Sequence, residues 1–208
     1  MKEIDFKIGW SGKAFDYTQE EIGTVIEAMQ HADPLTQGKH LKRFEEDFAK
    51  YAGTPYVFAV ANCTNALDLA AILTGLGKKD EVIIPAHTFC ATAIPFARTG
   101  ARIVWADIDP DTRVVSAESV LRHVTPKTKV IVVVHLYGLM VEMDKIMNIA
   151  KKHSCYVVED CAQAIGAEYK GKKAGEIGDF GAFSFHGQKH LTTLGEGGML
   201  TVKAEKLA

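Results

Sequence analysis

Residues 129–160 read KVIVVVHLYGLMVEMDKIMNIAKKHSCYVVED. The run at residues 129–134 is rich in β-branched side chains, which is typical of a strand buried on both faces of a sheet. Apolar residues then recur at helical spacing over residues 144–153, and a second short apolar run covers residues 156–159. This order of strand, helix and strand predicts two parallel strands connected by a helix that covers one face of the sheet.

The same alternation of elements continues on both sides of this unit. Short apolar runs predict further strands at residues 56–60, 81–85, 102–107, 179–185 and 198–202. Helical spacing predicts helices at residues 64–76, 88–99 and 117–123, the second of them interrupted by Pro95. We therefore expect an α/β fold, a three-layer α/β/α sandwich with a mostly parallel sheet.

The first part of the chain carries helices but no strand. Thr18 and Glu21 stand at the spacing of a capping box, which predicts a helix over residues 19–30. A second amphipathic helix follows before the first predicted strand. We expect residues 1–53 to form an N-terminal helical segment that packs on a large domain made of residues 54–208.

The composition is that of an ordinary globular protein. Among 208 residues there are 24 Lys and Arg, 26 Asp and Glu, a net charge of −2 and 47% hydrophobic residues, which excludes a disordered or collagen-like chain. The near-neutral charge argues against nucleic acid or an anionic membrane as the main partner. No apolar run reaches the ~18–20 residues of a membrane-spanning helix.

The four cysteines predict neither disulfides nor a metal site. Cys63, Cys90, Cys155 and Cys161 show no CxxC spacing and no histidine at zinc spacing, so we expect reduced thiols and no bound metal. The first ten residues contain no apolar core of a signal peptide. Together these features predict a cytoplasmic protein.

Ligands of open α/β sheets bind beyond the carboxyl ends of the strands, so the residues found there are candidates for a site. Cys63 and Thr64 start a helix directly after the first predicted strand, where free N–H groups form either an anion site or a plain helix cap. The chain contains neither GxGxxG nor GxxxxGK[ST], which excludes the common dinucleotide and P-loop fingerprints.

Two charged residues at later strand ends are further candidates. Asp160 ends the run YVVED and could hold Mg²⁺, a ribose hydroxyl or a protonated ring nitrogen, or could serve as a helix cap or ion-pair partner. Lys189 lies 29 residues later in a glycine-rich loop with few charges. Most lysines are simply solvated, but one in such a loop could act as a Schiff-base nucleophile.

These candidates together match the needs of one cofactor. Pyridoxal 5′-phosphate requires a phosphate site, an acidic partner for its pyridine nitrogen, a flat side chain on its ring and a lysine for its aldehyde. The start of the helix at Cys63, the carboxylate of Asp160, the ring of Phe89 and the amine of Lys189 supply these four groups. The combination is far more specific than any one of its members.

The chain also resembles a known family. Six stretches carry the resemblance: LTQGKHLKRFEEDFAKYAG (35–53), AVANCTNALDLA (59–70), DEVIIPAHTFCATA (80–93), VVVHLYGLMVEMDKI (132–146), VVEDCAQAIGA (157–167) and GDFGAFSFHGQKHLTTLGEGGML (178–200). In order and content they are similar to the DegT/DnrJ/EryC1/StrS family of pyridoxal-phosphate-dependent sugar aminotransferases, whose large domain has fold type I. The similarity ends about halfway along a typical member, so we expect an incomplete large domain and no C-terminal small domain.

The resemblance implies a role for seven residues. Cys63, Thr64 and Ser184 would bind the phosphate, Phe89 would stack on the ring, Asp160 would pair with the pyridine nitrogen, Gln163 would contact the phenolic oxygen, and Lys189 would form the Schiff base. Of these, Lys189 and Asp160 would be catalytic, with Lys189 also moving a proton between cofactor and substrate. A dehydratase branch of the family has histidine in place of this lysine, so Lys189 favours amino transfer.

The implied function is transfer of an amino group from glutamate or glutamine to a keto sugar, most simply a nucleotide-linked one, in polysaccharide or antibiotic sugar biosynthesis. The resemblance also implies a homodimer. Two alternatives stay open: the same chemistry on a keto-cyclitol or an aminobenzoate precursor, and a non-catalytic regulatory or interaction protein that keeps the fold. Whether the 208 residues are active alone is left open by the missing half.

Overall fold

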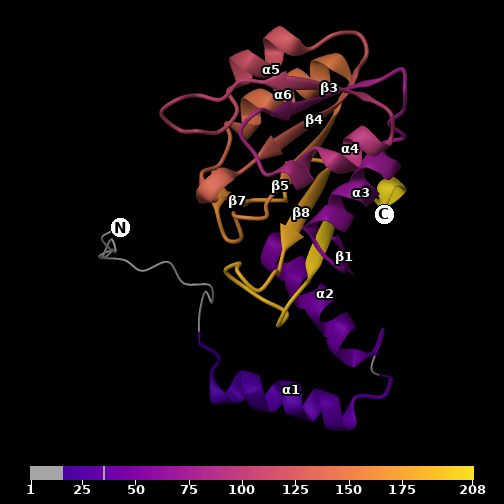
Figure 1. The fold of residues 1–208 in the computed structure, drawn as a ribbon, viewed down its shortest axis with the longest axis vertical. Coiled ribbons are helices and arrows are strands. Elements are labelled where there is room, and N and C mark those ends of the chain that lie inside the picture. Colours follow the sequence, from indigo (N-terminus) through magenta and orange to yellow (C-terminus); the bar gives the residue numbers. More distant parts are fainter. Residues whose placement is uncertain (1–15, 35) are drawn as a thin grey trace, which may run out of the picture.

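The computed structural model describes residues 16–34 and 36–208, and its centre is a seven-stranded sheet (Figure 1). In chain order the strands are β1 (Tyr56–Val60), β2 (Glu81–Pro85), β3 (Arg102–Ala106), β4 (Thr128–Val134), β5 (Tyr156–Asp160), β8 (Phe180–Ser184) and β9 (Gly198–Val202). In space their order is β1-β9-β8-β5-β4-β2-β3. The five strands from β8 to β3 pair in parallel, and β9 runs antiparallel to both β8 and β1. The mostly parallel sheet predicted from the sequence is confirmed.

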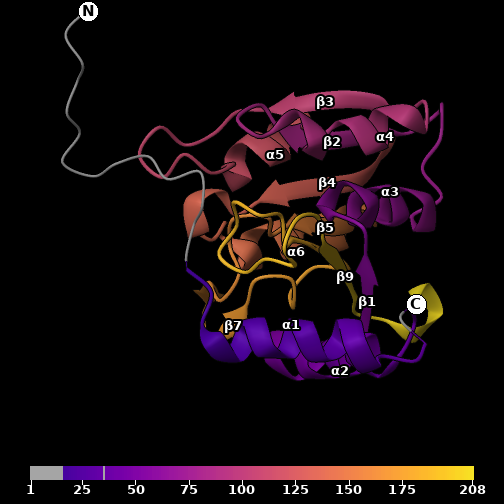
Figure 2. The ribbon, with the colours of Figure 1, turned by 60° about the horizontal axis from the view of Figure 1, so that its bottom comes forward.

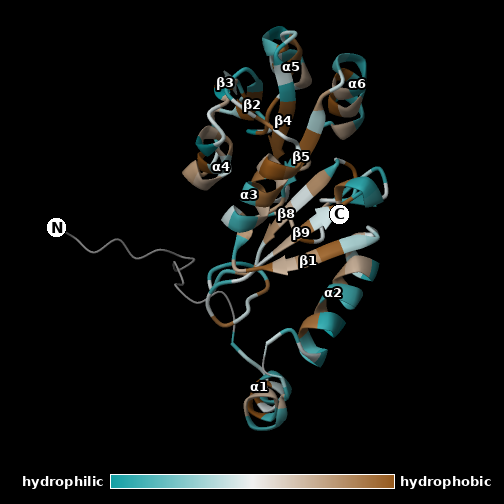
Figure 3. Cartoon of the chain, turned by 90° about the vertical axis from the view of Figure 1, so that its right-hand side faces the viewer, coloured by the Kyte–Doolittle hydropathy of each residue, from teal (hydrophilic) through white to brown (hydrophobic). Residues whose placement is uncertain are grey.

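Helices cover both faces of this sheet (Figure 3). They are α2 (Lys39–Ala52), α3 (Cys63–Leu73), α4 (Ile94–Arg98), α5 (Ala117–His123) and α6 (Met143–His153). Alternate residues of β4 enter opposite layers: Val130 and Val132 pack on the side of α3 and α4, whereas Ile131 and Val133 pack on the side of α5 and α6. This confirms the α/β/α sandwich and explains the continuous apolar run of β4.

The N-terminal helices differ in how they meet the sheet. Phe48 of α2 is only 4% exposed and makes edge-on ring contacts with Phe183 and Phe185. By contrast, α1 (Gln19–His31) buries none of its residues, although Thr18 forms the predicted capping box with Glu21. Figures 1 and 2 show α1 and β3 at opposite ends of the molecule.

Three local features differ from the predictions. Residues 88–99 form no continuous helix, because Pro95 instead occupies the first turn of α4, after the short helix η1 (Cys90–Thr92). Helix α3 ends at Leu73, and Gly75 then adopts a φ of 64°. Cys90, which we expected to be buried because a free cysteine behaves as a small apolar residue, is exposed.

The remaining elements are small. They are the hairpin strands β6 (Glu168–Tyr169) and β7 (Lys172–Lys173), and the short helices η2 (Leu136–Gly138) and η3 (Glu205–Leu207). Two-residue strands carry too short a pattern to be predicted from the sequence. Within the described part of the chain, no helix has both the length and the apolar character needed to cross a membrane.

Candidate functional site

Asp160 lies at the carboxyl end of β5, in the middle of the sheet. Its neighbours in register are Val134 of β4 and Ala182 of β8. The side chain is buried, with Oδ2 accepting a hydrogen bond from the Thr92 hydroxyl at 2.7 Å and Oδ1 accepting one from the Ala162 N–H at 3.1 Å. Each carboxylate oxygen therefore keeps a lone pair for a further donor.

Opposing influences act on the protonation of Asp160. Burial raises the pKa of this carboxyl group above its usual value, while the two hydrogen bonds and the nearby His135 and Lys189 side chains act to lower it. Burial is the largest of these causes. A cation placed against Asp160 would therefore favour its ionised form.

Lys189 lies half-buried in the loop that connects β8 to β9. The strand before this loop, β8, pairs with β5, which Asp160 ends. The positive charge of Lys189 is one of the influences that act to lower the pKa of Asp160 and Cys63, against the larger effect of burial. The loop is braced internally, because the Gly187 N–H donates to the Gly195 carbonyl at 2.7 Å. The Thr193 hydroxyl likewise donates to the carbonyl of Glu196 at 2.8 Å.

The start of α3 forms the third part of the site. Asn62 caps the helix by accepting from the Asn65 N–H at 2.9 Å, and helix geometry leaves the N–H groups of Cys63 and Thr64 without an intrahelical acceptor. Backbone N–H groups in this position bind phosphate well.

The start of α3 lies against the start of β9. A Cβ atom built on Gly198 would lie 2.3 Å from the carbonyl carbon of Asn62, so this approach requires glycine. Gly198 pairs in register with Ser184 at the end of β8. The contact brings the segments that carry Thr64 and Ser184 to one end of the sheet, as the phosphate prediction requires.

The Cys63 side chain turns into the protein rather than outward. It packs in the cluster of apolar residues under α3, and burial raises the pKa of its thiol well above the usual value. The thiol therefore stays protonated. Any contribution of Cys63 to an anion site comes from its backbone N–H.

Gln163 and Phe89 each present a group that can contact a ligand. The side-chain oxygen of Gln163 accepts from the Tyr137 N–H at 3.0 Å, which leaves the NH₂ group of this amide as the donor. Phe89 directly precedes η1, the helix that contains Thr92, and its ring is 72% exposed. The ring is therefore accessible to a flat ligand.

A buried cluster beside the site was not predicted. His135, Glu159 and Cys161 place their potential ligand atoms within 4.8 Å of one another. However, the Glu159 carboxylate already accepts from His135 and from the N–H groups of Gly175, Ile177 and Gly178. Because these donors occupy both oxygens, the cluster is a structural network rather than a metal centre.

Thr92 was also missed, although a signal for it was present. Thr88 and Thr92 are four residues apart in a segment predicted to be helical, and side chains at that spacing share a face. In the structure their hydroxyl oxygens are 2.7 Å apart. Sequence alone gave no reason to connect either threonine with Asp160.

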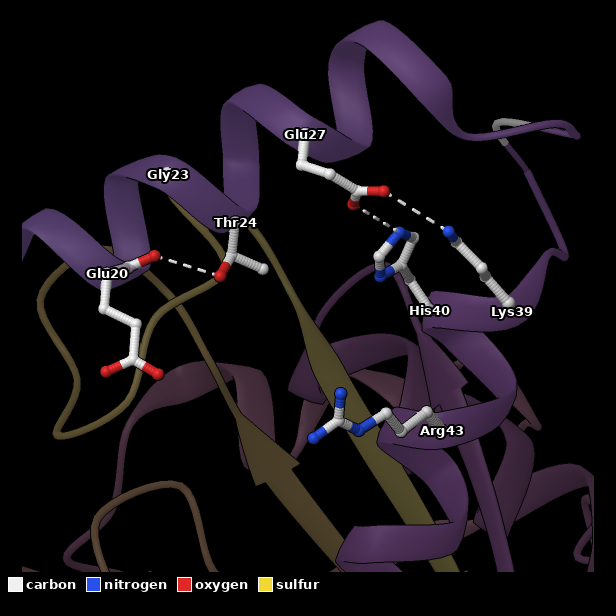
Figure 4. A pocket seen from close by; sticks show the side chains of 7 residues that line it. All are labelled: Glu20, Gly23, Thr24, Glu27, Lys39, His40 and Arg43. Carbon is white, nitrogen blue, oxygen red and sulfur yellow. Dashed lines mark hydrogen bonds and ion pairs between the residues drawn. The ribbon is translucent and has the colours of Figure 1, made fainter.

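Two hollows of the surface lie near α1 rather than at Asp160. A cavity of about 580 Å³ separates α1 from α2, where Glu27 pairs with Lys39 at 3.4 Å and with His40 at 3.6 Å (Figure 4). A second, of about 440 Å³, is lined by α1 together with Thr192 and Leu194 from the Lys189 loop. Neither contains Asp160 or Lys189, so the convergence of chemical groups, and not the size of a cavity, locates the candidate site.

Known proteins resemble this chain over nearly all of its length. The model of the DegT/DnrJ/EryC1/StrS aminotransferase family matches residues 16–208. The GDP-perosamine synthase of Caulobacter vibrioides is 43% identical over 184 residues, which are 88% of this chain and 49% of that protein. The L-glutamine:2-deoxy-scyllo-inosose aminotransferase of Streptomyces fradiae is 41% identical over 169 residues, 81% of this chain and 40% of that one.

A solved structure shows the same fold. The PLP form of the putative sugar aminotransferase Spr1654 of Streptococcus pneumoniae superposes with a TM-score of 0.88 at 32% identity. The match covers 98% of this chain and 55% of that one. The chain thus spans about half the length of the proteins that it matches.

Proposed function

The chain belongs to the DegT/DnrJ/EryC1/StrS aminotransferase family, and from this premise we propose that it forms the cofactor-binding part of a sugar aminotransferase dependent on pyridoxal 5′-phosphate. The acceptor is a keto sugar carried on a nucleotide, and the amino donor is glutamate or glutamine. In this proposal residues 54–208 bind the cofactor, α2 is the part of the N-terminal segment that packs on them, and the working unit is a homodimer. Residues 1–15 of that segment lie outside the described residues.

The residues present fit the cofactor. Asp160 is a buried carboxyl group whose ionised form needs a cation, and a protonated pyridine nitrogen is one. The amide NH₂ of Gln163 is a donor for a phenolic oxygen, and the N–H groups at the start of α3 are donors for a phosphate.

Each of these residues has a defined task. The bound cofactor supplies an electron sink for the negative charge that develops on the substrate carbon. Asp160 keeps the proton on the ring nitrogen, and Lys189 holds the cofactor and afterwards moves a proton at its Nζ atom. Phe89 covers a face of the ring. Thr64 and Ser184 add hydroxyl donors to the N–H groups that hold the phosphate.

The observation that carries the proposal is the convergence of Asp160 and Lys189. They are 29 residues apart in sequence, yet Asp160 ends β5 and Lys189 lies in the loop that follows the neighbouring strand β8, where its charge is among the influences that lower the pKa of the Asp160 carboxyl group. A protein that only keeps the fold has no use for a buried acid beside a lysine, because burying the acid disfavours its charge. The similarity to a GDP-perosamine synthase supports a nucleotide-linked sugar as the substrate.

A second substrate class also has support. The similarity to an aminotransferase that acts on 2-deoxy-scyllo-inosose is nearly as high, at 41% identity. That relative favours a keto-cyclitol as the acceptor and glutamine as the donor. The two classes differ in the presence of a nucleotide diphosphate, which gives a direct way to separate them.

The test is a comparison of acceptors with one loaded protein. The protein is incubated with the cofactor, an amino donor and either a GDP- or UDP-linked keto sugar or a free keto-cyclitol, and aminated product is measured by mass spectrometry. Product from the nucleotide-linked sugar alone is expected. Product from the cyclitol alone would shift the proposal to the second class, and absence of cofactor binding would refute both.

A further inference from the structure

Two threonine hydroxyls form a chain that ends on the buried carboxylate of Asp160. Thr88 Oγ1 and Thr92 Oγ1 are 2.7 Å apart, and Thr92 Oγ1 is 2.7 Å from Asp160 Oδ2. Thr92 is 1% exposed and Asp160 is 5% exposed, so bulk water does not replace these bonds. Both distances are those of well-formed O–H···O hydrogen bonds.

The direction of donation along these two hydrogen bonds follows from counting the available hydrogens. A hydroxyl has one hydrogen to donate, and an ionised carboxylate can only accept. When Asp160 is ionised, the Thr92 hydrogen points at Oδ2, so the hydrogen between the two threonines must come from Thr88. If Asp160 carried a proton on Oδ2, both bonds could run the other way. When Asp160 is ionised, Thr88 therefore donates to Thr92, and Thr92 donates to Asp160.

We propose that Thr92 is a positioning residue, which holds the Asp160 carboxylate ionised and aimed at the cofactor ring, and that Thr88 fixes the direction of the Thr92 hydroxyl. This inference rests on the proposed function for the identity of the ligand that Asp160 faces. The hydrogen bonds themselves lie within the protein and do not depend on that ligand. Oδ2 is occupied by Thr92 and Oδ1 by the Ala162 N–H. These two donors set the plane of the carboxylate and leave its free lone pairs for a third donor.

Other groups around Asp160 complete its surroundings. His135 from the end of β4 and Lys189 from the loop after β8 lower the pKa of Asp160, as the Thr92 hydrogen bond also does. Cys63 and Cys161 face it as thiols whose pKa is raised well above the usual value, so they remain neutral. Thr92 is thus an uncharged donor whose loss changes no other charge.

The first experiment needs no cofactor. Thr92→Val removes the hydroxyl at nearly constant shape, and Thr74→Val is the matched control, since Thr74 is 3% exposed and donates to the Ala71 carbonyl at 2.8 Å. Burial raises the pKa of Asp160, so its ionised form lowers stability as pH rises. Without Thr92 that penalty grows, and the stability lost in Thr92→Val should increase as pH rises from acid values, where Asp160 is protonated, to alkaline values, where it is ionised.

Urea unfolding across this pH range measures the loss. A loss that is constant with pH, as expected for Thr74→Val, would overturn the proposal, because it would show that the hydroxyl does not distinguish the two forms of Asp160. Thr92→Ser keeps the hydroxyl and should restore the pH profile of the unchanged chain. Thr88→Val should give a smaller effect of the same sign.

The second experiment uses pyridoxal 5′-phosphate itself. Equilibrium dialysis at an acid and an alkaline pH should show Thr92→Val binding the cofactor roughly ten- to a hundredfold more weakly at the acid pH, with a smaller deficit at the alkaline one. Equal affinity of the variant and the unchanged chain at both pH values would show that Thr92 does not aim Asp160 at the cofactor ring. If the unchanged chain failed to bind the cofactor, the proposed function would fall, while the unfolding experiment would still decide whether Thr92 holds Asp160 ionised.

Discussion

His135 Nε2 and Glu159 Oε2 are 2.8 Å apart, and both side chains are completely buried. The His135 Nδ1 atom accepts from the Val141 N–H at 3.3 Å, so Nε2 carries the hydrogen that Glu159 accepts. The other Glu159 contacts are three backbone N–H groups between Gly175 and Gly178. The pair therefore ties β4 and β5 to a distant loop, directly beside Asp160.

Removing one partner of this network should destabilise the fold strongly. Glu159→Gln brings amide hydrogens against backbone donors, so we expect the free energy of unfolding to fall by roughly 3–5 kcal/mol. Urea denaturation measures it. Glu142→Gln is the control. It removes the exposed ion pair between Glu142 and Lys145 and should lower the free energy of unfolding by less than about 1 kcal/mol. Equal effects of the two changes would show that the buried network is dispensable.

Lys189 should be the residue that holds the cofactor. Borohydride reduction of the loaded protein followed by peptide mapping is expected to place the label on Lys189, and Lys189→Arg should abolish it because a guanidinium is not nucleophilic. Lys203→Arg serves as the control, since Lys203 donates instead to the Ile177 carbonyl at 2.8 Å. A label on another lysine of the unchanged protein would contradict the assignment.

Asp160→Asn should impair catalysis far more than folding. An amide cannot keep the ring nitrogen protonated, so we expect the rate of amino transfer to fall by several powers of ten. Burial raises the pKa of Asp160, and its charge therefore lowers stability at alkaline pH. The variant should consequently be at least as stable as the unchanged protein near pH 8. Near-normal turnover, or a large loss of stability at that pH, would count against the assigned role.

Asp144 in the first turn of α6, which accepts a hydrogen bond from Lys170 of the β6–β7 hairpin, should be strongly acidic. Hydrogen bonds from Lys170 and Tyr169 lower the pKa of Asp144 to about 2. Lys170→Ala removes the larger of these causes, and an NMR titration should then show the Asp144 pKa nearer to its ordinary value. Because the folded pKa is depressed, this contact favours folding at neutral pH and loses its effect as pH falls toward 2. An unchanged titration curve would show that Lys170 does not reach Asp144 in solution.

The exposed face of α1 should lie in a homodimer interface. Ile22, Ile26 and Met29 are 39%, 48% and 76% exposed, and apolar groups of this kind on one helix are typical of an interaction surface. Light scattering is expected to show a dimer that Ile26→Glu weakens. Leu121→Glu, at a residue of α5 that is 52% exposed, is the matched control and should leave the dimer intact. A monomeric unchanged protein would refute the prediction.

The fold was predictable where the pattern of a segment is local. Residues 56–60, 81–85 and 198–202 form strands with the predicted bounds, because each apolar run is short and enclosed by turn residues. Pro95 shows the limit of such patterns. It was expected to break a helix, but a proline is tolerated in the first turn, so it begins α4 instead.

The site was predictable in part for a related reason. Asp160, Lys189 and the start of α3 were expected because parallel strands present their carboxyl ends at one edge of the sheet. Thr92 and Glu159 were not, since a threonine or a glutamate in sequence carries no sign of its partner. Their contacts span 68 residues to Asp160 and 24 residues to His135.

The sequence by itself determined the order of strands and helices, the apolar layers and the residue types available at each strand end, because these depend on spacing along the chain. Only the tertiary structure decided that β9 runs antiparallel between β1 and β8, which brings Gly198 against Asn62 and closes the end of the sheet. It also decided which hydroxyl reaches Asp160. The physical reason is that hydrogen bonds and burial are set by distances in space, and a buried polar group must take whichever partner the packed chain brings to it.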